Sequence, residues 1–132
     1  MLTVRIYSFS YKKSGIPADT TINGGGFVFD CRFINNPGRI TEFINLTGKD
    51  IKIIEFLNSN TDMQKFLKNV FNILDKVVDK YIERGFTDLM VSFGCTGGQH
   101  RSVYTSEKLN RYLKNKYGDT IITELQHLDI PD

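Results

Sequence analysis

The sequence predicts an α/β fold: a β-β-α-β-α-β sandwich in which a roughly four-stranded mixed sheet packs against helices. Apolar residues follow helical 3,4 spacing from Met63 to Ile82. The run 88–93 is largely apolar, as in a strand that is buried on both faces. A chain of 132 residues with 40% hydrophobic and 24% charged residues suits a single domain over 1–132 with its own core.

The first part of the chain predicts two strands joined by a loop. Residues 2–9 alternate between apolar and polar side chains, which is typical of a half-buried strand. The stretch 12–26 ends in three glycines and is a loop by composition. Residues 27–33 predict a second strand, which a turn over 35–38 closes.

Helix-capping residues and helix-ending glycines predict where the remaining helices begin and end. A short helix is expected after Asp50, a plausible N-cap within the ambiguous stretch 39–60. Thr61 and Gln64 have capping-box spacing, so the long helix should begin at Thr61 and end before Gly85. A further helix over about 102–117 and a last strand over 120–125 complete the order.

Composition narrows the function classes. The net charge of +2 gives no general reason to expect nucleic acid or a membrane as partner, and no run approaches the roughly 20 apolar residues of a membrane helix. Without an export signal, Cys31 and Cys95 are expected to be free thiols in a reducing cytoplasm. Metal-ligand spacing is absent, Gly48-Lys49 lacks the rest of a nucleotide P-loop, and no metal or cofactor is expected.

The segment Ser92–Ser102, Ser-Phe-Gly-Cys-Thr-Gly-Gly-Gln-His-Arg-Ser, predicts a strand–loop–helix that binds a phosphate group. Its glycines let the backbone curl around one centre, and the helix N-terminus adds unpaired N–H donors. Arg101 offers a planar fork for two phosphate oxygens, and the hydroxyls of Thr96 and Ser102 can donate. The head of a helix normally favours acids, so His100 and Arg101 there indicate an anion between them and the helix.

Two other segments could complete the pocket. Asp30 and Arg32 end the second predicted strand, and Asp30 could pair with an arginine or receive an amine or hydroxyl of a ligand. Lys12 and Lys13 begin the first loop, where a solvated surface role is an equal alternative. The complete predicted ligand-binding set is Cys95, Thr96, Gly97, Gly98, His100, Arg101, Ser102, Asp30, Arg32 and Lys12.

Residues 94–103 resemble the Gly-Cys-Thr-Gly-Gly-x-His-Arg-Ser-Val signature of the C-terminal domain of RapZ proteins. The similarity extends to Gly15-Ile16-Pro17 and to the run 27–33, and so covers nearly the whole chain. RapZ proteins carry a nucleotide-binding P-loop domain ahead of this one, so the chain looks like a stand-alone version of the C-terminal domain.

The resemblance implies a ligand sensor. In the best-known RapZ proteins, the C-terminal domain binds glucosamine-6-phosphate and presents a small RNA for processing. The matching pocket positions are Thr96, Gly97, Gly98, His100 and Arg101, with Asp30, Arg32 and Lys12 matching family positions nearby.

One departure concerns RNA. The RNA-binding relatives end in a basic tail, whereas residues 118–132 contain no Lys or Arg and four acids, namely Asp119, Glu124, Asp129 and Asp132. Any RNA affinity is therefore expected to be weak and electrostatic, through a basic patch of Lys12, Lys13, Arg32, Arg39 and Arg101.

Three functions compete. The leading interpretation is a non-catalytic sensor of a small phosphorylated metabolite. Cys95 and Arg101 also fit the Cys-x5-Arg pattern of cysteine phosphatases, with Asp30 as general acid, but Gly94 stands where those enzymes usually have His. The third is an RNA-binding adaptor or protein-docking module, which includes a homo-oligomer or a subunit of a nucleotide-binding RapZ-type protein.

Overall fold

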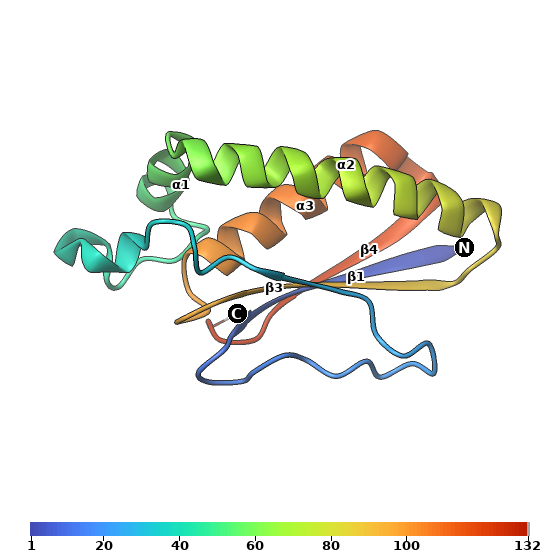
Figure 1. The fold of residues 1–132 in the computed structure, drawn as a ribbon, viewed down its shortest axis with the longest axis horizontal. Coiled ribbons are helices and arrows are strands. Elements are labelled where there is room, and N and C mark those ends of the chain that lie inside the picture. Colours follow the sequence, from blue (N-terminus) through green and yellow to red (C-terminus); the bar gives the residue numbers. More distant parts are fainter. Residues whose placement is uncertain (132) are drawn as a thin grey trace.

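A computed structural model describes residues 1–131 and confirms the α/β class and the four-stranded sheet (Figure 1). The strands and α-helices are, in chain order, β1 (Leu2–Ser10), β2 (Phe27–Asp30), α1 (Ile51–Asn58), α2 (Thr61–Glu83), β3 (Asp88–Cys95), α3 (Arg101–Tyr117) and β4 (Ile121–His127). Three short 3-10 helices are also present, η1 (Pro37–Arg39), η2 (Thr41–Phe43) and η3 (Gly118–Thr120). No helix within 1–131 combines the length and apolar character needed to cross a bilayer.

The sheet is parallel throughout, with strand order β2-β3-β1-β4, so the prediction of a mixed sheet was wrong in this respect. β1 pairs with β3 from Thr3↔Asp88 to Ser10↔Cys95 and with β4 on its other side. Each connection returns the chain to the same end of the sheet before the next strand begins. All four strands therefore end at one edge, where their following loops meet.

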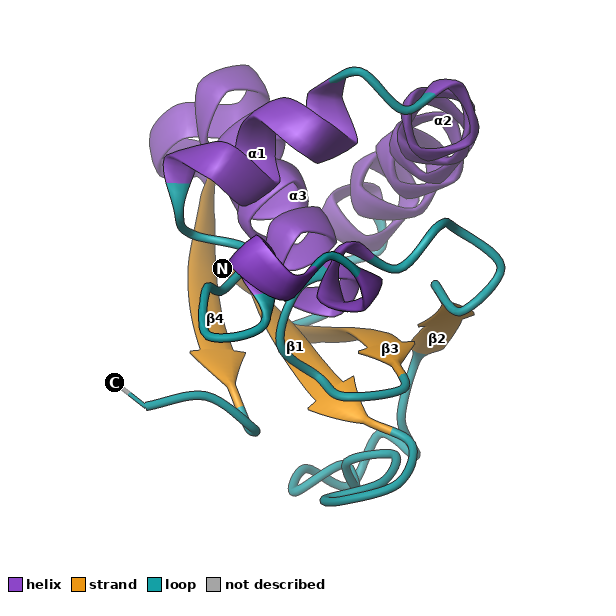
Figure 2. Cartoon of the chain, turned by 90° about the vertical axis from the view of Figure 1, so that its left-hand side faces the viewer, coloured by secondary structure: helices purple, strands orange, loops and turns teal. Residues whose placement is uncertain are grey.

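The two faces of the sheet are covered differently. The three helices lie on one face, and the loop over residues 11–26 runs along the other (Figures 1 and 2). Arg5 of β1 pairs with Asp19 of this loop at 2.8 Å, and the Asp19 carboxylate also accepts a hydrogen bond from the Gly25 N–H. The strand that alternation predicted to be half-buried is consequently buried on both faces.

The long helix agrees with its predicted stripe, and its cap differs by one residue. Five residues of the stripe are buried, namely Met63, Leu67, Val70, Leu74 and Val78. The N-cap is Asn60, whose Oδ1 accepts from the Met63 N–H at 2.9 Å, and not Thr61. Gln64 does not close a capping box, because its amide donates to the Leu57 carbonyl and to the Tyr104 hydroxyl.

Other boundaries differ from the pattern at strand ends. β2 ends at Asp30 rather than at residue 33, and β4 covers Ile121–His127 rather than 120–125. Asp50 is the N-cap of α1 as predicted, but its carboxylate accepts from the Thr47 N–H, in the turn that precedes the helix. This places Thr47 and Gly48 against the start of α3, where the Gly48 N–H donates to the Gln99 carbonyl.

Candidate functional site

The loop between β3 and α3 borders a cavity of about 230 Å3 at the carboxyl edge of the sheet, the edge that faces the viewer in Figure 2. The cavity is lined by Asn36, Gly38, Ile44, Cys95, Thr96, Gly97, Gln99, His100 and Arg101. Half of the predicted ligand-binding set lies there, namely Cys95, Thr96, Gly97, His100 and Arg101. The opposite wall comes from the segment around η1 and η2.

Arg101, the first residue of α3, carries a buried and uncompensated charge. It is 4% exposed. Its Nη1 donates to the carbonyls of Arg32 and Ile34, at 2.9 and 2.7 Å, which fixes the guanidinium beside the cavity. Its Nε is buried with no hydrogen-bond partner, and no carboxylate within residues 1–131 forms an ion pair with it. A buried cation in this state is unfavourable unless an anion joins it.

The backbone of the loop leaves its donors free. Within residues 1–131, none of the N–H groups of residues 96–103 donates a hydrogen bond to another protein group. No side chain caps α3, and its first turn holds no acid. Free N–H groups at a helix head, with the partial positive charge of the helix dipole, favour an anion.

Gly98 explains how the loop holds this shape. Its φ of +66° is in the left-handed region, which favours glycine. A Cβ at this position would lie 2.9 Å from the backbone nitrogen of Ser10 and 2.9 Å from the Cβ of Asp129. Gly98 therefore packs against the end of β1 and the C-terminal segment, and it supports the loop without lining the cavity.

His100 presents a hydrogen-bond acceptor to the cavity. It is 7% exposed, and its Nε2 lies 3.0 Å from the Phe43 carbonyl oxygen. A carbonyl can only accept, so Nε2 carries the proton and donates. Burial lowers the pKa of His100 below the 6.5 of an exposed histidine, so the ring is neutral at pH 7. Its Nδ1, on the side of Gly38, is then an acceptor.

This protonation state predicts how stability depends on pH. The pKa of His100 is lowered in the folded state, so the unfolded chain binds the proton more tightly and stability falls as the pH drops through 6.5. We expect the melting temperature to fall between pH 7 and pH 5.5. His100→Gln, which retains a side-chain donor for Phe43, should reduce this dependence. If the melting temperature of the variant depends on pH as strongly as that of the parent, His100 is protonated equally in the folded and unfolded states. Burial also lowers the pKa of His127, which accounts for the pH dependence that remains in the variant.

Gln99 joins the loop to the opposite wall. Its side-chain amide donates to the carbonyls of Ile44 and Leu46, at 2.6 and 2.7 Å. Four lining residues, Asn36, Gly38, Ile44 and Gln99, were not in the predicted set. Gln99 lies inside the predicted loop, and Asn36 and Gly38 lie inside the predicted turn over 35–38, so position offered a signal for these three but not for Ile44.

The sulfur and hydroxyl groups behind the loop are buried. The Cys95 thiol donates to the Ser102 Oγ at 3.1 Å, and both residues are almost inaccessible. Cys95 reaches the lining of the cavity, whereas Ser102 does not. Cys31 is a second free and fully buried thiol, and burial raises its pKa to about 12. Among residues 1–131 no three His, Cys, Asp or Glu side chains gather where they could hold a metal ion.

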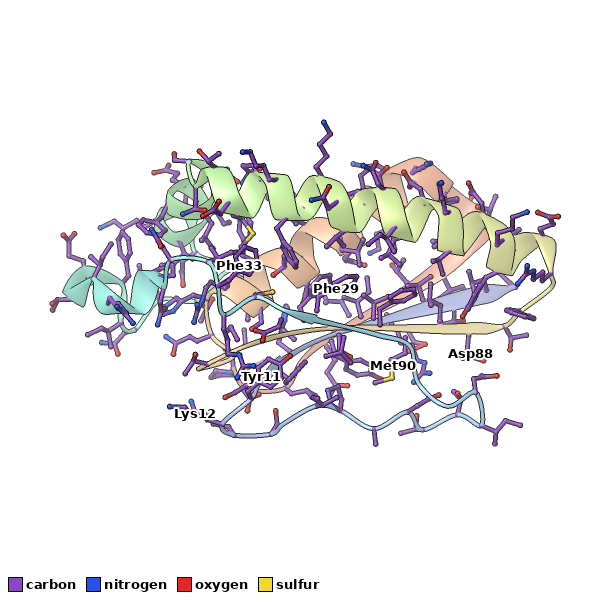
Figure 3. The ribbon with its side chains drawn as sticks, in the orientation of Figure 1. Tyr11, Lys12, Phe29, Phe33, Asp88 and Met90 are labelled. Carbon is purple, nitrogen blue, oxygen red and sulfur yellow. The ribbon has the colours of Figure 1, made fainter. Side chains whose placement is uncertain are left out.

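The remaining predicted residues lie outside the cavity lining. Asp30 and Arg32 are about half exposed and form an ion pair at 2.6 Å, which lowers the pKa of the Asp30 carboxyl. The Arg32 guanidinium also stacks on the Tyr11 ring, at 3.8 Å from its centroid. Lys12 is exposed at the start of loop 11–26, on the opposite side of the sheet from α2 (Figure 3).

Comparison with known proteins gives a consistent result. A family model described as the RapZ C-terminal domain matches residues 2–131. The chain is 36% identical over 130 residues to a nucleotide-binding protein of Acidobacterium capsulatum. The aligned residues make up 98% of this chain and 39% of that protein. It is 38% identical over 128 residues to one of Bacillus licheniformis, with 97% and 40% covered. The chain thus spans about two fifths of the length of these relatives.

Proposed function

The chain belongs to the RapZ C-terminal domain family, and we propose that the cavity beside Arg101 binds a small phosphorylated metabolite, namely an amino-sugar phosphate. The domain would act as a sensor of that metabolite, without catalysis. The observation that carries the proposal is the guanidinium of Arg101, which is 4% exposed and has no carboxylate partner within residues 1–131.

A phosphate group would meet the needs of this wall of the cavity. Its charge compensates Arg101, and its oxygens can accept from the guanidinium and from the free N–H groups of the loop. The Thr96 side chain adds a hydroxyl among the lining residues. The residues that line the cavity include no Asp or Glu, whose carboxylate would repel the phosphate.

The rest of the cavity favours a small polar group on the ligand. His100 Nδ1 can accept from a hydroxyl or an ammonium, and the wall opposite is built from η1, η2 and their carbonyls. The volume of about 230 Å3 lies below the roughly 300–1,000 Å3 of drug-sized ligand sites. A monosaccharide phosphate fits this space better than a nucleotide.

The proposal is tested by melting curves with glucosamine-6-phosphate, inorganic phosphate and glucosamine. A ligand at about 100 times its Kd stabilises the native state by about 2.7 kcal/mol, which for this size raises the melting temperature by roughly 10 °C. We expect this shift with glucosamine-6-phosphate, a smaller one with phosphate, and none with glucosamine. Equal responses to glucosamine and to its phosphate would refute a phosphate site.

Two observations disfavour the cysteine-phosphatase alternative. Cys95 lines the cavity but is only 2% exposed, and its thiol donates a hydrogen bond to the Ser102 Oγ, which leaves little of the sulfur open to a phosphorus atom. Asp30, the candidate general acid, is paired with Arg32, and its lowered pKa leaves it without a proton at neutral pH. We therefore propose binding without phosphoryl transfer.

An RNA contact, where present, is proposed to be weak and electrostatic. Lys12 and Arg39 are exposed and belong to the basic patch, but the acids of the C-terminal segment oppose a longer track. Asp129 of that segment already accepts from the Ser10 N–H and the Ser14 hydroxyl, while Asp132 lies outside the described residues.

We propose that the domain works in the cytoplasm, where two free thiols such as Cys31 and Cys95 stay reduced.

A further inference from the structure

A second hollow lies next to the candidate cavity and carries more positive charge. It has a volume of about 430 Å3 and is lined by Arg32, Phe33, Ile34, Asn35, Asn36, Arg39, Ile40, Phe56 and Arg101. Three of these residues are arginines and none is an acid. Within residues 1–131, Arg32 is paired with Asp30, whereas Arg39 and Arg101 have no ion-pair partner.

Arg101 and Asn36 line both spaces, so the two are adjacent and these two residues lie between them. Arg101 is held by two carbonyls through Nη1, and its buried Nε has no partner. The Oδ1 of Asn36 accepts from the Gly38 N–H at 2.9 Å, which leaves the amide NH2 of Asn36 as a donor. The boundary between the two spaces therefore offers the Arg101 guanidinium and the Asn36 amide NH2 as donors to an anion.

The outer part of the second hollow adds a free cation and an apolar surface. Arg39 is exposed at the end of η1 and can reach a bound anion without first breaking an ion pair. Phe33 is 61% exposed and lies on the helix side of the sheet (Figure 3). Ile34 and Phe56 contribute further apolar area to the lining. The anionic group of a bound ligand could therefore pair with the Arg39 guanidinium, while the carbon atoms of the ligand pack against these apolar side chains.

We infer that this hollow is a second anion subsite, so that a sugar phosphate with a second, separated anionic group binds more tightly than a monophosphate, with one anionic group on each side of Arg101. The inference rests on the proposed function, because it assigns the first anionic group to the cavity already described. Arg39 is the residue that distinguishes the two subsites, since it lines the second hollow and not the first.

The test compares sugars that differ by one phosphate. Dissociation constants are measured by calorimetry, at constant ionic strength, for glucose-6-phosphate against glucose-1,6-bisphosphate and for fructose-6-phosphate against fructose-1,6-bisphosphate. We expect the bisphosphate of at least one pair to bind 10-fold or more tightly than its monophosphate. Arg39→Ala should remove this advantage and leave the monophosphate affinity within about 2-fold. Arg84→Ala, which removes an exposed arginine at the far end of α2, is the matched control and should change neither value.

The outcomes separate this inference from the proposed function. Monophosphate binding with no bisphosphate advantage, or an advantage that survives Arg39→Ala, would overturn the second subsite and leave the first in place. Equal losses in Arg39→Ala and Arg84→Ala would show general electrostatic attraction and would likewise overturn it. If none of these sugars binds but glucosamine-6-phosphate does, the second subsite is wrong and the proposed function stands. If glucosamine-6-phosphate does not bind either, both are wrong.

Discussion

Arg101→Ala is expected to abolish the stabilisation by a phosphorylated ligand. The substitution removes the one buried cation of the cavity, and the loss of one partner from a buried charge pair costs about 2–5 kcal/mol of binding free energy. This corresponds to a loss of affinity of roughly 30-fold or more. Calorimetric titration of the variant with glucosamine-6-phosphate measures the loss directly.

The variant also leaves the carbonyls of Arg32 and Ile34 without their donor, so its melting temperature without ligand should fall. Arg101→Lys provides the second measurement, because a lysine keeps the charge but lacks the fork that holds two carbonyls. We expect it to fold and to bind more weakly than the parent. Parental affinity in both variants would place the anion elsewhere.

Gly48→Ala is expected to give a large loss of stability at a residue that does not line the candidate cavity. A Cβ on Gly48 would lie 2.4 Å from the His100 carbonyl oxygen and 2.5 Å from the Tyr104 nitrogen. Both atoms belong to the backbone at the head of α3, so the clash is relieved only when the helix or the 47–50 turn moves. We expect the free energy of unfolding, measured by urea denaturation, to fall by about 1–3 kcal/mol or more.

Gly97→Ala is the matched control and should behave in the opposite way. A Cβ there meets nothing within 4 Å, and its φ is not positive, so the free energy of unfolding should change little. Gly97 does line the cavity, however, and an added methyl group should weaken binding. A stable Gly48→Ala variant would show that the turn and α3 are not tightly packed.

Local sequence patterns predicted the elements well, and tertiary contacts account for the errors. The stripe from Met63 to Val78 is visible in sequence because helical period and burial coincide. Strand direction has no such local signature, so the parallel sheet was not foreseen. The burial of Arg5 was also not predictable, because its partner Asp19 lies in a loop whose path across the sheet depends on the whole fold.

The same distinction applies to the candidate site. The loop from Cys95 to Arg101 is continuous in sequence, so its glycines and cations indicated a shared location. Gly38 and Ile44 reach the cavity only because Gln99 and His100 hold the η1–η2 segment through its carbonyls. For Asp30 the sequence left a contact with the ligand and a pair with Arg101 or Arg32 open, and the structure shows its carboxylate engaged by Arg32.

The position of β1 has a consequence for how the protein is made. β1 is the first strand in the sequence, yet both of its partners, β3 and β4, come late; the contact from Ser8 to His127 spans 119 residues. During translation β1 therefore has no strand to pair with until β3 has been made, and its other side stays unpaired until β4 follows. Sheets that depend on such distant pairings fold slowly, and an unpaired apolar strand is prone to aggregate. The nascent chain should accordingly depend on chaperones until its last strand emerges.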